Sequence, residues 1–128
     1  MTGWDPAATA LLGILPRAAR GPRREGVFAL WLTMRVAQDL LRDPPPAERA
    51  HRRRLQALEQ RLTSLTLPPP LRRALAAAIS QLREARPETA AQVLSQLVAP
   101  ARESAGTEAG DAVAQAARAA RAAVRAER

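Results

Sequence analysis

Large apolar side chains are concentrated in the first hundred residues of this chain. Val, Ile, Leu, Met, Phe and Trp together occupy 27 positions between Trp4 and Val98, but only two positions, Val113 and Val124, beyond them. Because a fully buried side chain of this kind contributes roughly 1.5–3 kcal/mol, the first part of the chain can form one hydrophobic core. The last 28 residues cannot form a second one, so we expect them to pack on the first part or to move independently of it.

Proline and glycine divide the chain into stretches with a helical spacing of apolar residues, and no stretch alternates as a strand does. Asp5 is a good N-cap for a first helix, which Pro16 should kink or end. A second helix is expected from about Pro22 to Arg42. Its middle part, residues 27–37, is apolar on almost every side, which is typical of a central helix or of one half buried in a partner.

Three further helices are predicted in the first part of the chain. The third follows the stiff segment "DPPP" and runs from about Ala47 to Leu65, with leucines at spacings of three, four and three that form a packing seam. The fourth follows the second proline run, Pro68–Pro70, and Pro87 separates it from the fifth. Pro100 is expected to end the fifth helix, because proline has no backbone N–H to donate.

The end of the chain has a different composition. Residues 101–110, "ARESAGTEAG", are mostly small or polar and include two glycines, which is typical of a linker. Ala-rich sequence resumes at Asp111, a good N-cap. The sequence therefore predicts an all-α fold with three parts. These are a compact antiparallel bundle of about five helices in residues 1–100, a linker at 101–110, and a flexibly joined, Ala/Arg-rich C-terminal helix over 111–128.

The charge of the chain is its most informative property for function. All twenty Lys or Arg positions are arginine, and alanine fills 30 positions. A joint bias toward Ala, Arg and Pro is typical of GC-rich coding sequence, so the choice of Arg over Lys is weak evidence of a role. The net charge of +8, of which residues 1–100 carry +7, favours acidic or polyanionic partners.

Several classes of protein are disfavoured by the sequence. Without Cys there is no disulfide framework and no thiol chemistry. The first residues, "MTGWDP", lack the basic region of a secretory signal. The longest apolar run, residues 27–37, is interrupted by Thr33 and Arg35 and is much shorter than the roughly 20 residues of a membrane span. We expect a cytoplasmic protein of bacterial type that is not embedded in a membrane.

The C-terminal helix carries a row of arginines. They follow one another at spacings of three, four and three, which places them on one helical stripe; they are Arg118, Arg121, Arg125 and Arg128. Such a stripe can contact successive phosphates or an acidic groove. A structural explanation is also open, because Glu108 and Asp111 near the helix start and arginines near its end are what the helix dipole favours, and the helix can simply be solvated.

Two further groups of arginines occur earlier in the chain. One follows the first helix and the other begins the third; they are Arg17, Arg20, Arg23 and Arg24, and Arg49, Arg52 and Arg53. If the two groups adjoin in space, they form a patch that can track phosphates. With no Asn or Tyr, one Phe and two Trp, binding to DNA or RNA should be largely blind to base sequence. The alternative is an ordinary solvated surface.

The single histidine does not by itself indicate an enzyme. Glu48 and His51 form a Glu-x-x-His pair, the spacing that di-iron helical bundles use, but such a site needs a second pair and further carboxylates. The chain also has no glycine-rich phosphate loop and no candidate catalytic triad. We therefore expect His51 to be an ordinary interfacial histidine beside the arginines, and we predict no catalytic residues, no metal and no cofactor.

The sequence supports two hypotheses about function. The first is a non-enzymatic helical binding module, a small subunit or adaptor in an assembly, whose Arg-rich faces contact nucleic-acid backbone or an acidic protein surface. The alternative is a homo-oligomeric protein–protein scaffold without a nucleic-acid role. In that case the central helix dimerises through Phe28, Trp31 and Leu32, and the charge serves solubility. Neither hypothesis involves a small-molecule substrate.

Overall fold

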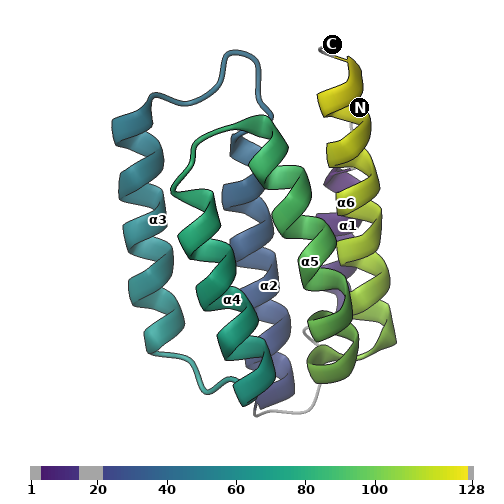
Figure 1. Cartoon of the computed structure of the whole chain (residues 1–128). Coiled ribbons are helices and arrows are strands. Elements are labelled where there is room, and N and C mark those ends of the chain that lie inside the picture. Colours follow the sequence, from purple (N-terminus) through teal and green to yellow (C-terminus); the bar gives the residue numbers. More distant parts are fainter. Residues whose placement is uncertain (1–3, 15–21, 127–128) are drawn as a thin grey trace.

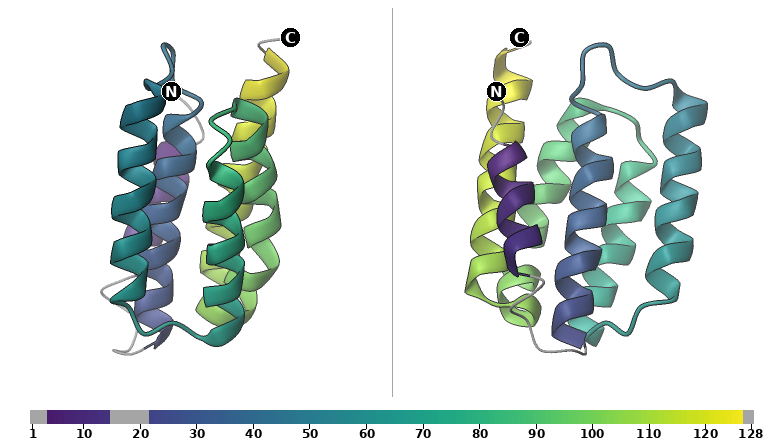
Figure 2. Two further views of the ribbon diagram at one scale, coloured as in Figure 1. Left: turned by 60° about the vertical axis from the view of Figure 1, so that its left-hand side comes forward. Right: turned by 180° about the vertical axis from the view of Figure 1, so that it is seen from behind.

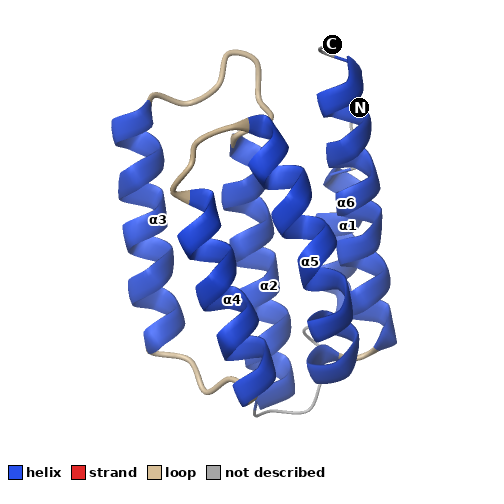
Figure 3. Ribbon diagram, viewed as in Figure 1, coloured by secondary structure: helices blue, strands red, loops and turns tan. Residues whose placement is uncertain are grey.

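The computed structural model describes residues 4–14 and 22–126, and in these residues it contains helices and connecting turns but no strand (Figure 3). The prediction of an all-α fold is therefore confirmed for the described part of the chain. Six helices follow one another there (Figure 1); they are α1 (Trp4–Ile14), α2 (Pro22–Asp39), α3 (Glu48–Thr63), α4 (Pro69–Leu82), α5 (Pro87–Ala105) and α6 (Thr107–Ala126).

Proline sets several helix boundaries, as the sequence predicted. Pro69 and Pro87 occupy the first turns of α4 and α5, where the missing N–H has no helical acceptor to lose. Pro100, however, does not end α5, which continues through it to Ala105. Ala101 beyond the proline is fully buried, so continued packing offsets the lost hydrogen bond. Gly106, with a φ of 100°, then stops the helix, because few other residues adopt this conformation.

The helices are arranged in two layers of three. Figure 2 shows α1, α2 and α3 in one layer and α4, α5 and α6 in the other, with consecutive helices running in opposite directions. Across the layers, α1 contacts α6, α2 contacts α5, and α3 contacts α4. Helices α3 and α4 therefore form one edge of the molecule, and α1 and α6 form the other.

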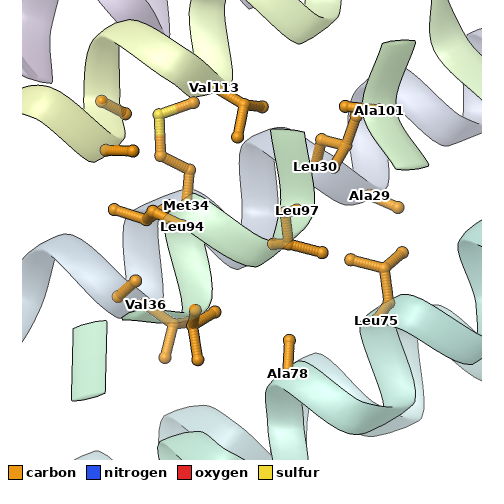
Figure 4. Packing of buried hydrophobic residues seen from close by; sticks show 14 of the residues in the cluster. Ala29, Leu30, Met34, Val36, Leu75, Ala78, Leu94, Leu97, Ala101 and Val113 are labelled. Carbon is orange, nitrogen blue, oxygen red and sulfur yellow. The ribbon is translucent and has the colours of Figure 1, made fainter. Parts of the chain in front are cut away.

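The core lies between the layers around the middle of α2 and α5. Leu30 and Met34 of α2 and Leu94 of α5 are each at most 1% exposed, and Figure 4 shows them in the same apolar cluster as Val113 of α6. Val27 and Leu30, three positions apart in the sequence, are both buried in this core. Helix α2 is therefore the central helix, as its apolar character indicated.

The C-terminal helix is part of this core, which corrects the expectation of a flexibly joined arm. Residues 101–110 are helical except for Gly106, so they do not form the expected linker. Along α6, the side chains of Ala109, Ala112, Ala116 and Ala120 are buried, and the helix contacts α5, α1 and α2. A methyl group lets two helix backbones approach closely. Alanine can therefore hold a helix in place without the large side chains on which the expectation was based.

The packing of α6 predicts a position-dependent effect of a charged substitution. Ala116→Asp, which puts a carboxylate into the interior, should lower the free energy of unfolding by at least about 2 kcal/mol. Ala122→Asp, at an exposed position of the same helix, should have a much smaller effect. Urea unfolding followed by circular dichroism measures both. Equal unfolding midpoints for the two variants would show that α6 is not held in the core.

Candidate binding site on helices α3 and α4

The described members of the two arginine groups in the first hundred residues do not meet in one patch. Arg23 and Arg24 lie at the start of α2, where the Arg23 Nε donates a hydrogen bond to the carbonyl oxygen of Ala105 at 3.4 Å. Arg49 and Arg53 lie in the first turns of α3. Helices α2 and α3 are antiparallel, so their starts are at opposite ends of the molecule (Figure 1), roughly 24 Å apart for helices of this length.

The arginines of α6 form a separate group on the opposite edge of the molecule from α3 (Figure 1). The Arg121 Nη1 donates a hydrogen bond to Ser95 Oγ on α5 at 2.7 Å. Arg118 and Arg125 are exposed and have no side-chain partner within the described chain. Three other arginines that the sequence suggested as binding residues lie outside the described residues; they are Arg17, Arg20 and Arg128.

Ion pairs neutralise many of the described arginines. Such pairs on an exposed surface contribute little to stability, but each lowers the local positive potential. Six arginines of the described chain take part, as Arg42–Asp39 (3.5 Å), Arg52–Glu48, Arg54–Asp39 (3.0 Å), Arg83–Glu59 (3.4 Å), Arg86–Glu84 (2.8 Å) and Arg102–Asp111 (3.0 Å).

Two arginines on the exposed face of α3 are not neutralised by an ion pair within the described residues. Arg49 and Arg53 are one helical turn apart, both are exposed, and neither has an ion-pair or hydrogen-bond partner in the described residues. Together with Glu48, Arg52 and Gln56 they line a shallow depression of about 420 Å³. A planar guanidinium matches the geometry of a carboxylate or a phosphate, so this face can hold either anion.

A groove runs beside these arginines, between α3 and α4. It has two sections of about 400 and 390 Å³, which lie next to each other because Glu59 and Ile79 line both. The first section is lined by Arg52, Leu55, Gln56, Glu59, Ile79 and Arg83, and the second by Glu59, Leu62, Thr63, Leu65, Leu67, Arg72, Leu75, Ala76 and Ile79.

The leucine stripe of α3 explains why the groove is apolar. Leu55 and Leu58 are about 4% exposed, whereas Leu62 and Leu65, farther along the same stripe, are only half buried. The sequence predicted the stripe but assigned all of it to packing. On α4, the small exposed side chain of Ala76 leaves the groove open where a larger side chain would fill it.

The residues of α4 that line the groove were not among the binding residues predicted from the sequence. Arg72, Ala76, Ile79 and Arg83 succeed one another at spacings of four, three and four, which places them on one face of the helix. That face has an arginine at each end and small or apolar residues between them. This pattern was the available signal, but it indicates a groove only when α3 is known to lie opposite.

The proposed oligomer interface on α2 is covered by arginine side chains. The rings of Phe28 and Trp31 are stacked, with centroids 6.2 Å apart. The guanidinium of Arg35 lies 4.9 Å from the Trp31 ring centroid, and that of Arg61 lies 5.4 Å from the Phe28 ring centroid. Phe28, Trp31 and Leu32 are all half buried. Among the large apolar residues whose side chains the structure describes, Leu12 is the most exposed, at 45%.

His51 is a buried residue of the interface between α3 and α4. It is 0% exposed, and its Nε2–H donates a hydrogen bond to the Leu82 carbonyl oxygen at 2.7 Å. The buried Nδ1 has no partner among the described residues, and Glu48 pairs with Arg52. No group of three His, Asp or Glu side chains that could hold a metal ion occurs in the residues that the structure describes.

No protein-family model matches this chain, and no curated protein or solved structure is significantly similar to it. None of the described helices is both long enough and apolar enough to cross a membrane. On the described surface of the molecule, the α3 arginines and the adjoining groove are the most distinctive features.

The contacts of His51 predict a structural role for it. His51→Ala should lower the free energy of unfolding by about 2–4 kcal/mol, because it leaves a cavity and removes the donor to the Leu82 carbonyl. Arg53→Ala, two positions along the same helix and exposed, is the control and should leave the unfolding midpoint nearly unchanged. Chemical denaturation of the three proteins measures the difference. A His51→Ala variant as stable as the parent protein would refute the buried hydrogen bond.

Proposed function

We propose that this protein is a non-enzymatic helical binding module, a small subunit or adaptor, that holds an acidic protein surface against the exposed face of α3. One observation carries the proposal. Arg49 and Arg53 are exposed and have no ion-pair or hydrogen-bond partner in the described chain, and an apolar groove runs along the same helix. Free cations beside apolar surface suit a partner that offers both carboxylates and apolar side chains.

The same arrangement favours a protein partner over nucleic-acid backbone. Tight binding to a duplex depends on many phosphates being neutralised at once, and the described arginines of α2, α3 and α6 lie at opposite ends and edges of the molecule (Figure 1). Six of the described arginines are also in ion pairs. A phosphate backbone would leave the apolar groove unfilled. Nucleic-acid binding is therefore the second hypothesis, and the experiment below separates the two.

A homo-oligomeric scaffold is less well supported. Its interface would be Phe28, Trp31 and Leu32, which are half buried and lie partly beneath Arg35 and Arg61. Two copies of a chain with a net charge of +8 also repel each other at long range. An adaptor of the proposed kind needs neither a cofactor nor a metal, and a cytoplasmic location remains an expectation from the sequence.

The proposal predicts that binding depends on the α3 arginines in particular. The protein is immobilised and exposed to a nuclease-treated lysate at low salt, and captured protein is quantified. Arg49→Gln/Arg53→Gln should reduce capture by about tenfold, because each arginine contributes a charge-assisted hydrogen bond. Arg118→Gln/Arg125→Gln removes the same charge from exposed positions on α6 and should leave capture nearly unchanged.

Two outcomes would contradict the proposal. If both double variants lose capture equally, the protein attracts acidic partners through its net charge and has no site on α3. If capture occurs only from a parallel lysate without nuclease, and nuclease then releases material absorbing at 260 nm from the immobilised protein, the partner is nucleic acid.

A further inference from the structure

The groove between α3 and α4 has the dimensions of a short helix. Its two adjoining sections lie beside α3 from Arg52 to Thr63. This distance is about three helical turns, or roughly 16 Å. Helices α3 and α4 lie side by side and form the two walls of the groove. A third helix can bind between them, as in other complexes where a helix binds in a groove.

The chemistry of the groove differs between its floor and its rim. The half-buried Leu62 and Leu65 and the exposed Ala76 supply apolar surface to it. The rim carries Arg52 and Arg83 at one end and Arg72 at the other. Glu59 lies midway and is within 3.4 Å of Arg83, and Arg52 pairs with Glu48 on the same helix. Arg72 has no ion-pair partner in the described residues, so the rim keeps a net positive charge. An occupant that satisfies both parts must be apolar on one face and acidic beside it.

We propose that this groove binds an amphipathic helix of an acidic partner protein. The apolar stripe of that helix packs on Leu62 and Leu65, and its flanking carboxylates pair with Arg72 at one end of the groove and with Arg52 at the other. The inference rests on the proposed function, whose partner it specifies by structure and charge.

Other occupants fit the groove less well. A second copy of this chain would place the same basic rim opposite itself, and like charges at an interface oppose association. Nucleic-acid backbone would pair with the arginines of the rim but would leave the apolar floor uncovered. Only a partner with the opposite charge and an apolar stripe complements both the floor and the rim.

A displayed library of helical peptides tests the charge of the occupant. The library fixes leucine along one face of an 18-residue helix, about five turns, and randomises the flanking positions among Glu, Lys, Ser and Ala. Selection on the intact protein should enrich Glu over Lys at the flanking positions. Enrichment of Lys, or the absence of any selected peptide, would overturn the proposal.

A matched pair of substitutions on α4 tests the place of binding. Ala76 and Ala77 are adjacent and both exposed, but only Ala76 lines the groove. Ala76→Glu should weaken binding of the selected peptide by at least about tenfold, because it places bulk and negative charge where the peptide lies. Ala77→Glu should change the dissociation constant by less than about twofold. Fluorescence anisotropy of the labelled peptide measures both, and circular dichroism confirms that both variants fold.

Equal effects of the two substitutions would show that the peptide binds elsewhere and would overturn the proposal. So would a dimer, detected by light scattering, that Ala76→Glu dissociates, because the occupant would then be a second copy. The proposed function is tested separately by Arg49→Gln/Arg53→Gln. If that variant loses capture from the lysate while Ala76→Glu keeps it, the acidic partner binds α3 but does not enter the groove.

Discussion

The close approach of α5 and α6 is the contact on which the rest of the structure depends. Both helices contribute buried alanines, among them Ala101 and Ala105 on α5 and Ala109 and Ala112 on α6. Because methyl groups keep the two backbones near each other, α6 fits against α5 and still reaches α1 and α2. This packing closes one edge of the two-layer structure with small side chains and leaves the large ones for the interior.

The other edge, formed by α3 and α4, is built from large leucine side chains instead of alanines. This difference in side-chain size creates the groove. Helix α3 supplies leucines at the spacing of a packing seam, but it contacts only α2 and α4. Leu62 and Leu65 therefore stay half buried. A chain that needed only stability would gain by covering them, since exposed apolar surface is unfavourable in water. The open edge is thus a feature that stability alone does not explain, and it is where a partner can add to the fold.

The sequence predicted those features of the fold that depend on neighbouring residues. It was misleading for features that depend on packing between distant segments. Helical spacing and proline positions predicted an all-α chain and the starts of α2 to α5 to within a few residues, because turns and caps are decided by neighbouring residues. The position of α6 could not be inferred by counting large side chains, since its buried face consists largely of Ala109, Ala112, Ala116 and Ala120. The candidate groove could not be predicted from the sequence either. It combines residues of α3 and α4, and nothing local shows which faces of two helices meet.

Arginine has a second property that is relevant to the groove besides its charge. Its long apolar stem can lie along apolar surface, and its guanidinium can lie over an aromatic ring, as Arg35 does over Trp31 and Arg61 over Phe28. Arg52, Arg72 and Arg83 line the groove at its ends. Their stems can shield its leucines in the free protein and move aside when a partner enters. The same side chains would then reduce the cost of an open apolar groove and select a partner of negative charge.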